Sequence, residues 1–192
     1  AVIELGANHV GEIDFTSKIT QPDVAIITNI GAAHLEGFGG ISGVVKAKSE
    51  IFNHLTNDGC AIFDGESEYS QQWREQNKIR SITAFSQTPM TDERAIWSSN
   101  VTLDEQGCAQ FVFNRTSDNE TDSIQIILPI PGLHNVKNAL AAGAVVLALG
   151  FNLQDIANGL KTMSEVKGRL NLIAVTECIT VIDDTYNANS SS

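Results

Sequence analysis

Short apolar runs and amphipathic stretches alternate along the chain, and this alternation predicts an α/β fold. Two short apolar runs with β-branched residues, at residues 2–5 and 24–30, predict buried strands. Further strands are predicted at residues 60–63, 79–85, 170–175 and 179–182. Stretches with helical periodicity or a helix-start signal are found at residues 12–20, 41–55, 67–76, 133–149 and 152–160. Strands that alternate with helices predict a mainly parallel sheet with right-handed crossovers and helices on its faces.

The section from about residue 95 to residue 129 has a different pattern. Apolar or alternating runs are found there at residues 96–103, 108–113 and 124–128. A polar turn at residues 104–107 separates the first two runs, which predicts a hairpin. Pro129 and Pro131 follow the third run and are expected to break the chain. The pattern therefore predicts an antiparallel β-meander inserted into the mainly parallel fold.

The helix predicted at residues 41–55 carries a lysine on its apolar face. At about 100° per residue, Lys48 lies at the centre of a stripe formed by Ile41, Val44, Val45, Ile51, Phe52 and Leu55. Lys46 and Glu50 are expected on the opposite, solvent-facing side. A lysine buried in this way has a lowered pKa, a bound anion or a modification. The alternative, equally compatible with the helix alone, is a packed stem whose ammonium group reaches solvent.

The composition argues against several classes of protein. A chain of 192 residues, 42% of them hydrophobic, can form one large domain or one and a half small ones with a buried core. Its net charge of −11 argues against a surface that tracks the phosphates of a nucleic acid. No apolar stretch is long enough for membrane insertion, and the start lacks the basic region and cleavage pattern of a signal peptide. The three widely spaced cysteines suit a reducing cytoplasm.

Polar groups follow three of the predicted strands: Glu4, Asn8 and His9; Asn29, His34 and Glu36; and Asp183 and Asp184. Ligands of open parallel sheets bind beyond the carboxyl ends of the strands, so the three groups predict one shared cleft. The alternative is three separate, solvated loop starts. Glu4 ends an apolar run and needs a cation, for which Mg²⁺ or an arginine is suitable. His34 is either a metal ligand or proton-transfer group, or simply a hydrogen-bonded histidine.

A second set of polar residues suits a nucleotide. Asn135 and Asn138 share one face at the start of an Ala-rich helix, where carboxamides can recognise a base or serve as caps. Arg169 is either a phosphate contact or a surface arginine. The chain contains no G-x-x-x-x-G-K-[ST] phosphate-binding loop.

Several stretches resemble the central domain of the Mur ligases, and within them the MurF branch. They are ELGANHVGEI (residues 4–13), TNIGAAHLEGFG (28–39), AKSEIF (47–52), LPIPGLHNVKNALAA (128–142), GRL (168–170) and IDDTYNAN (182–189). They occur in the order of the family and span essentially the whole chain. The resemblance implies a P-loop-NTPase-like α/β fold, in agreement with the pattern above.

The resemblance also implies an activity. Mur ligases of this branch use ATP to phosphorylate the terminal carboxylate of UDP-N-acetylmuramoyl-tripeptide, and the amine of D-alanyl-D-alanine then attacks the acyl phosphate to form an amide. The implied magnesium site includes Glu4, His34 and Lys48, the lysine as a carbamate. His34 and Lys48 are the implied catalytic residues, beside the acceptor carboxylate. Location in the bacterial cytoplasm is also implied.

For the nucleotide, the resemblance implies that Asn135 and Asn138 lie near the adenine. Arg169 is implied to contact a phosphate, and Asp184 to hold the ribose hydroxyls. The family's phosphate-binding loop is expected before Ala1, and its N- and C-terminal domains are expected outside residues 1–192. We therefore expect a truncated central domain that is inactive alone.

Other functions stay open at this point. A folylpolyglutamate synthase-like enzyme or another Mur ligase would share the central architecture, although GANHVGEI and DDTYNAN argue against the first. A metal-dependent hydrolase built on Glu4, His9, His34 and Glu36 would bind a transition metal without nucleotide. A folded piece with no enzymatic role of its own is the third alternative.

Overall fold

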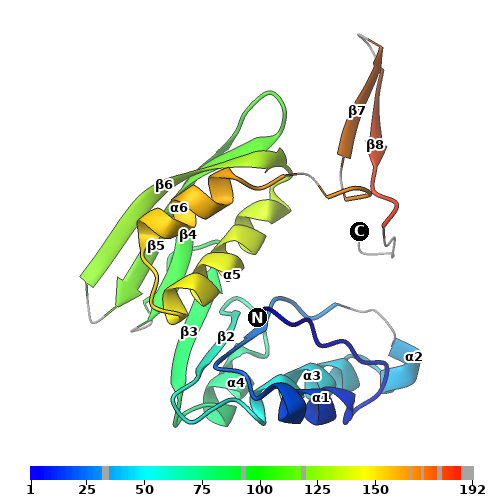
Figure 1. Ribbon diagram of the computed structural model, residues 1–192, viewed down its shortest axis with the longest axis vertical. Coiled ribbons are helices and arrows are strands. Elements are labelled where there is room, and N and C mark those ends of the chain that lie inside the picture. Colours follow the sequence, from blue (N-terminus) through cyan, green and yellow to red (C-terminus); the bar gives the residue numbers. More distant parts are fainter. Residues whose placement is uncertain are drawn as a thin grey trace.

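The computed structural model describes residues 1–31, 35–91, 94–117, 120–164, 166–169, 171–176 and 179–186. Helices cover both faces of the parallel part of a six-stranded sheet and one face of its antiparallel part (Figure 1). The strands, in both sequence and spatial order, are β1 (Val24–Ile27), β2 (Cys60–Asp64), β3 (Ser81–Ser86), β4 (Ala95–Leu103), β5 (Cys108–Ser117) and β6 (Glu120–Pro131). The neighbours from β1 to β4 pair in parallel, and β4, β5 and β6 pair antiparallel. The predicted α/β fold and its meander are thus confirmed, and the meander extends the parallel sheet.

All five predicted helices form close to their expected positions. They are α1 (Glu12–Thr20), α3 (Ile41–Ser49) with the 3₁₀ turn η1 (Glu50–Phe52), α4 (Ser70–Gln76), α5 (His134–Ala148) and α6 (Leu153–Lys161). The short helix α2 (Leu35–Phe38) was not predicted. The start of α6 is a capping box, because Asn152 Oδ1 accepts from Asp155 N and Asp155 Oδ2 accepts from Asn152 N, both at 3.0 Å. No helix in the described ranges is long and apolar enough to cross a membrane.

Strand β2 shows why its run is apolar throughout. All five of its residues are buried, and they alternate between the two faces of the sheet. Cys60 and Ile62 belong to the core cluster that contains α5 and α6, whereas Ala61 and Phe63 belong to the cluster that contains η1 and α4. A strand covered on both faces has no polar face, which explains the unbroken run.

The prediction that Pro129 and Pro131 break the chain is wrong. Strand β6 continues through both residues to its end at Pro131, which pairs with Cys108. β6 is an edge strand, with β5 as its neighbour in the sheet. A proline lacks the N–H that a central strand would donate, but an edge strand leaves that side unpaired, so the strand can continue.

The prediction of a strand at residues 2–5 is also wrong. Residues 1–7 have no regular secondary structure, and Val2 is fully exposed. A strand forms when its N–H and C=O groups find a neighbour, and within the described ranges this segment joins neither sheet. The apolar run was therefore insufficient evidence for a strand.

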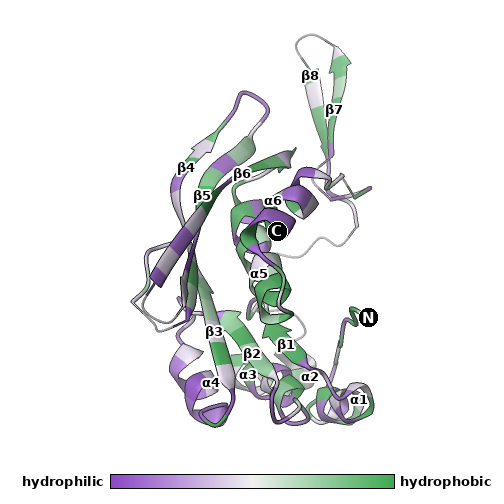
Figure 2. Ribbon diagram, turned by 60° about the vertical axis from the view of Figure 1, so that its left-hand side comes forward, coloured by the Kyte–Doolittle hydropathy of each residue, from purple (hydrophilic) through white to green (hydrophobic). Residues whose placement is uncertain are grey.

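The two closing strands do not join the main sheet. β7 (Asn171–Thr176) and β8 (Ile179–Asp183) form an antiparallel hairpin of their own. The hairpin stands away from the body of the molecule (Figure 1), although it carries hydrophobic residues along both strands (Figure 2). Its apolar side chains, among them Ile173, Val175, Val181 and Ile182, are exposed.

Candidate functional site

The carboxyl ends of β1, β2 and β3 lie at one edge of the main sheet, because these strands run parallel. The strands end at Ile27, Asp64 and Ser86. We call this region, with the loops and helix ends that reach it, the carboxyl edge. Ligands of open parallel sheets bind beyond such an edge, so it is the candidate functional site.

An ion pair connects the carboxyl edge to helix α5. Asp64, at the end of β2, is 7% exposed, and Lys137 Nζ lies 2.5 Å from its Oδ2. Its other oxygen, Oδ1, accepts the backbone N–H of Glu66 at 3.0 Å. A charge-assisted hydrogen bond of this kind fixes the first turns of α5 over the end of β2. The sequence reasoning missed this pair, although Asp64 directly follows a predicted strand.

A second carboxylate lies beside this ion pair. Thr88 Oγ1 donates a hydrogen bond of 2.8 Å to Glu66 Oε1, and Ser86 Oγ lies 3.1 Å from the same Thr88 hydroxyl. Burial raises the pKa of the Glu66 carboxyl, but hydrogen bonds from Thr88 and Ser86 and the charge of Lys137 hold it below its ordinary value. Two carboxylates, of Asp64 and Glu66, and the ammonium group of Lys137 on α5 therefore lie together beyond the end of β2.

The first turns of α5 carry the two predicted carboxamides. Asn135 Nδ2 donates to Pro131 O at 2.7 Å, and Asn138 Nδ2 donates to Asn135 Oδ1 at 3.1 Å. The two side chains thus share one face, as the spacing indicated. Lys137 lies between them in the sequence, so its ion pair with Asp64 brings this polar helix start to the carboxyl edge.

Lys48 is half-buried, on α3. Its Nζ donates a hydrogen bond of 3.0 Å to the backbone oxygen of Asn29, two residues after the end of β1. Burial lowers the pKa of Lys48 below the ordinary value of a lysine. Four of the six apolar residues predicted around it, Val44, Val45, Phe52 and Leu55, are buried, whereas Ile51 is half-buried and Ile41 is exposed. The lysine thus lies at the carboxyl edge, next to the end of β1.

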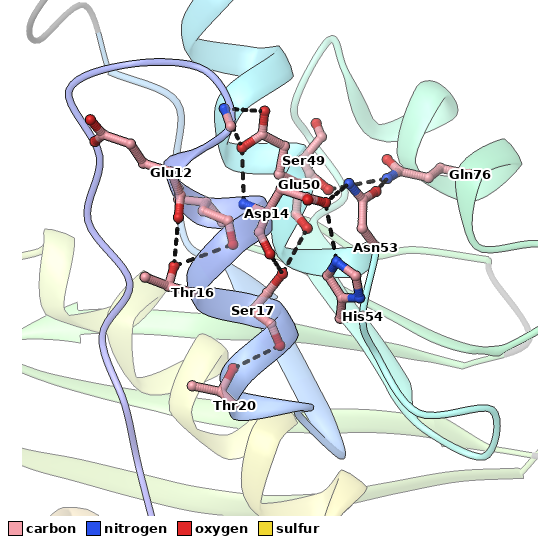
Figure 3. A network of polar contacts seen from close by, with 12 residues as sticks. Glu12, Asp14, Thr16, Ser17, Thr20, Ser49, Glu50, Asn53, His54 and Gln76 are labelled. Carbon is pink, nitrogen blue, oxygen red and sulfur yellow. Dashed lines mark hydrogen bonds and ion pairs between the residues drawn. The ribbon is translucent and has the colours of Figure 1, made fainter.

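The prediction that Glu50 faces solvent is wrong. Glu50 is 8% exposed, and its carboxylate accepts the backbone N–H groups of Gly11, at 2.8 and 2.9 Å, and of Asp14, at 3.1 Å (Figure 3). Gly11 is the N-cap of α1 and has no side chain to accept these groups, so Glu50 caps α1 from another helix. The helical turn also changes to 3₁₀ at Glu50, which changes the direction of its side chain from that of a continuous α-helix.

Further polar contacts fix α1 to the segment that follows Lys48 (Figure 3). Asn53 Nδ2 donates to Asp14 Oδ1 at 2.7 Å, and His54 Nε2 lies 3.3 Å from the same oxygen. The hydrogen bond from Asn53 contributes most to the lowered pKa of Asp14. On the other side, Trp73 Nε1 donates to Ser49 Oγ at 2.7 Å. The network therefore holds the end of α3 between α1 and α4.

Glu4, a predicted metal ligand, lies in the irregular start of the chain. Its side chain is exposed, and none of the described residues forms a hydrogen bond or ion pair with it. His9 Nδ1 instead lies 3.0 Å from Glu12 Oε1, in the loop and first turn of α1. Neither the metal site nor the arginine pair expected for Glu4 is found in the described part of the chain.

His34, the other predicted ligand, lies outside the described residues, as does the side chain of Glu36. Among the residues that the structure does describe, no three His, Cys, Asp or Glu side chains are grouped so that they could hold a metal ion. The described residues alone therefore do not fit a complete magnesium site. Magnesium stays a prediction from the resemblance.

Arg169 and Asp184 are found near the base of the β7–β8 hairpin. The Arg169 guanidinium lies 4.3 Å from the centre of the Tyr186 ring, and Tyr186 N donates to Gly168 O at 2.9 Å. Asp184 is exposed and follows β8. Because the hairpin stands away from the main sheet (Figure 1), the structure does not bring these two residues to the carboxyl edge.

In a comparison with protein families, residues 1–146 match a family described as the Mur ligase middle domain. Among curated proteins, the chain is 43% identical over all 192 residues to the UDP-N-acetylmuramoyl-tripeptide–D-alanyl-D-alanine ligase of Haemophilus influenzae and 41% identical to that of Escherichia coli. It spans 40% and 41% of the length of these two relatives.

Solved structures show the same likeness. A crystal structure of MurF from Acinetobacter baumannii matches with a TM-score of 0.87 and 44% identity, over all of this chain and 40% of that one. A MurF ligase from Thermotoga maritima, in complex with ADP, matches with a TM-score of 0.74 over 96% of this chain and 40% of that one. At 24% identity, the second match supports the fold alone.

Proposed function

The chain belongs to the Mur ligase middle-domain family, and on this premise we propose that it is the ATP-binding part of a UDP-N-acetylmuramoyl-tripeptide–D-alanyl-D-alanine ligase. One observation carries the proposal: identity of 41–43% over all 192 residues to two relatives with that name. The chain spans about 40% of their length, so the activity belongs to a longer protein. A cytoplasmic enzyme of cell-wall synthesis is the corresponding cellular role.

The proposed reaction has two steps. An oxygen of the terminal tripeptide carboxylate attacks the γ-phosphorus of ATP, the bond to the β-phosphate oxygen breaks, and ADP leaves. The amine of D-alanyl-D-alanine then attacks the carbonyl carbon of the acyl phosphate. A C–N bond forms, the C–O bond to phosphate breaks, and the amine loses a proton to solvent. Phosphoryl transfer of this kind depends mainly on positioning and electrostatic stabilisation.

Lys48 is the proposed carbamate of this site. A neutral amine attacks the carbon of CO₂ and loses a proton, which leaves an anionic carbamate on the side chain. The lowered pKa of Lys48 favours the neutral amine that this step needs. Its position near the end of β1, 3.0 Å from Asn29 O, supports a role at the carboxyl edge. By resemblance, His34 and Glu4 would be neighbours of the carbamate.

The proposed nucleotide contacts divide into two groups. Asn135 and Asn138 are placed at the carboxyl edge, next to the Asp64–Lys137 pair, which supports contact with an adenine there. Arg169 and Asp184 are assigned to the phosphate and ribose by resemblance alone. For them to contact the same nucleotide, the hairpin must lie closer to the carboxyl edge than it does in Figure 1.

The test is an assay of the full-length protein. ADP formation is measured with ATP, UDP-N-acetylmuramoyl-tripeptide and D-alanyl-D-alanine, and with each substrate left out in turn. The proposal predicts ADP formation that requires both the tripeptide and the dipeptide. Turnover with folate and glutamate instead, or none with the proposed pair, would contradict it. The 192-residue chain alone is expected to show no turnover in the same assay.

A further inference from the structure

A cavity of about 850 Å³ opens at the edge of the main sheet opposite the carboxyl edge. Its described lining residues are Asn57, Asp58, Arg74, Ile79, Arg80, Ser81, Ile82 and Arg94. Ser81 begins β3, Asp58 precedes the first residue of β2, and Arg94 precedes the first residue of β4. The cavity, which we call the amino-edge groove, is therefore separate from the site described above.

The amino-edge groove collects positive charge in an acidic protein. Three of the five arginines of the chain line it, although the net charge of the whole chain is −11. Asp58 is the single carboxylate among the lining residues that the structure describes. Such a concentration of one charge sign in a concave surface raises the local concentration of ions of the opposite sign.

Two of these arginines are held by neutral groups. Arg80 donates from Nη1 to Asn77 Oδ1 at 3.4 Å and from Nη2 to Leu55 O at 3.3 Å, and its Nε is buried without a hydrogen-bond partner in the described part of the chain. Arg94 Nη1 donates to Ser81 Oγ at 3.1 Å. Neutral acceptors orient a guanidinium group without neutralising its positive charge. The charges of both arginines can therefore attract an anionic ligand.

We propose that the amino-edge groove binds a small anion with two or more phosphate or carboxylate groups. Its volume lies within the range of about 300–1,000 Å³ found for small-molecule sites, which favours a small ligand. The planar guanidinium groups of Arg80 and Arg94 suit the paired oxygens of such groups. This binding is independent of the proposed ligase reaction, which uses the opposite edge of the sheet.

The test measures binding of pyrophosphate and of tricarballylate to the 192-residue chain by calorimetry at low ionic strength. Binding of either anion is expected, and the one that binds more tightly identifies a phosphate or a carboxylate ligand. Arg94→Gln is expected to weaken binding at least about tenfold, because it removes a charge-assisted contact. Asp58→Asn is expected to tighten binding about twofold to fivefold, because it removes a like charge.

Two control substitutions test whether cationic side chains outside the groove contribute to anion binding. Lys78 is exposed, pairs with Glu75 at 3.7 Å and does not line the groove, so Lys78→Gln should leave the affinity within about twofold. Arg115→Gln should also leave it unchanged, because Arg115 pairs with Asp122 at 2.8 Å and does not line the groove. Equal affinity of Arg94→Gln and the parent chain, a loss with Arg115→Gln alone, or no binding of either anion would overturn the proposal.

Discussion

Strand β2 and the β7–β8 hairpin have similar sequences and opposite surroundings. CAIFD in β2 is buried at every position, whereas NLIAVT in β7 and ITVID in β8 are exposed at almost every position. β2 has parallel neighbours on both sides and helices on both faces. β7 and β8 pair with each other alone in the described part of the chain. An apolar run therefore predicts a strand, but the surrounding chain decides whether that strand is buried.

The largest expected effect tests this contrast with one substitution at two sites. Ile62 in β2 is 0% exposed and Ile182 in β8 is 59% exposed. Ile62→Ala should lower the free energy of unfolding by about 2–5 kcal/mol, because it leaves a cavity in a packed core. Ile182→Ala should change it by less than about 0.5 kcal/mol. Urea unfolding of the 192-residue chain measures both. Equal losses would mean that the hairpin is covered in solution.

A second pair compares a covered and an open glycine within helices. A Cβ added to Gly143 in α5 would lie 2.5 Å from Phe113 Cε2, whereas one added to Gly159 in α6 has no neighbour within 4 Å. Gly143→Ala should destabilise the fold by about 1–3 kcal/mol through overpacking. Gly159→Ala should stabilise it by about 0.5–1 kcal/mol, because alanine favours a helix. Thermal unfolding of the two variants shows whether each substitution stabilises or destabilises the fold. Two changes of the same sign would contradict the close packing of Gly143 in α5 against Phe113.

A smaller effect is expected at the cap of α1. Glu50→Gln keeps the shape of the side chain but replaces one acceptor oxygen with an NH₂ group beside the N–H groups of Gly11 and Asp14. We expect a loss of about 1–2 kcal/mol in the free energy of unfolding. The control is Glu75→Gln, which removes an exposed ion pair with Lys78 and should cost less than about 0.5 kcal/mol. A loss at Glu50 no larger than at Glu75 would rule out the capping role.

Much of the fold could be predicted from the sequence, because periodicity reports which face of an element is buried. Helix α1 has the predicted bounds, and the helix-start signal at residue 152 corresponds to the capping box of α6. The segment at residues 2–5 could not be judged in this way, because strand formation there depends on a neighbour far along the chain. Glu50 was misplaced for a similar reason: its partners, Gly11 and Asp14, are distant in sequence.

Less of the candidate site could be predicted. The unusual environment of Lys48 followed from helical spacing, and its half-buried position agrees with it. The Asp64–Lys137 pair joins residues 73 positions apart, and no local pattern links them. The roles of Glu4, His34, Arg169 and Asp184 rest on resemblance, and they stay predictions.

The most direct test of the account is the turnover of the full-length enzyme with a substitution at Lys48. Lys48→Ala should lower kcat at least about 100-fold, the size of effect found when a group that stabilises charge in the transition state is removed. Lys46→Ala is the matched control, because Lys46 is exposed on the same helix two residues away, and its turnover should equal that of the parent. Unchanged turnover in Lys48→Ala would contradict the account and leave Lys48 as a packing residue.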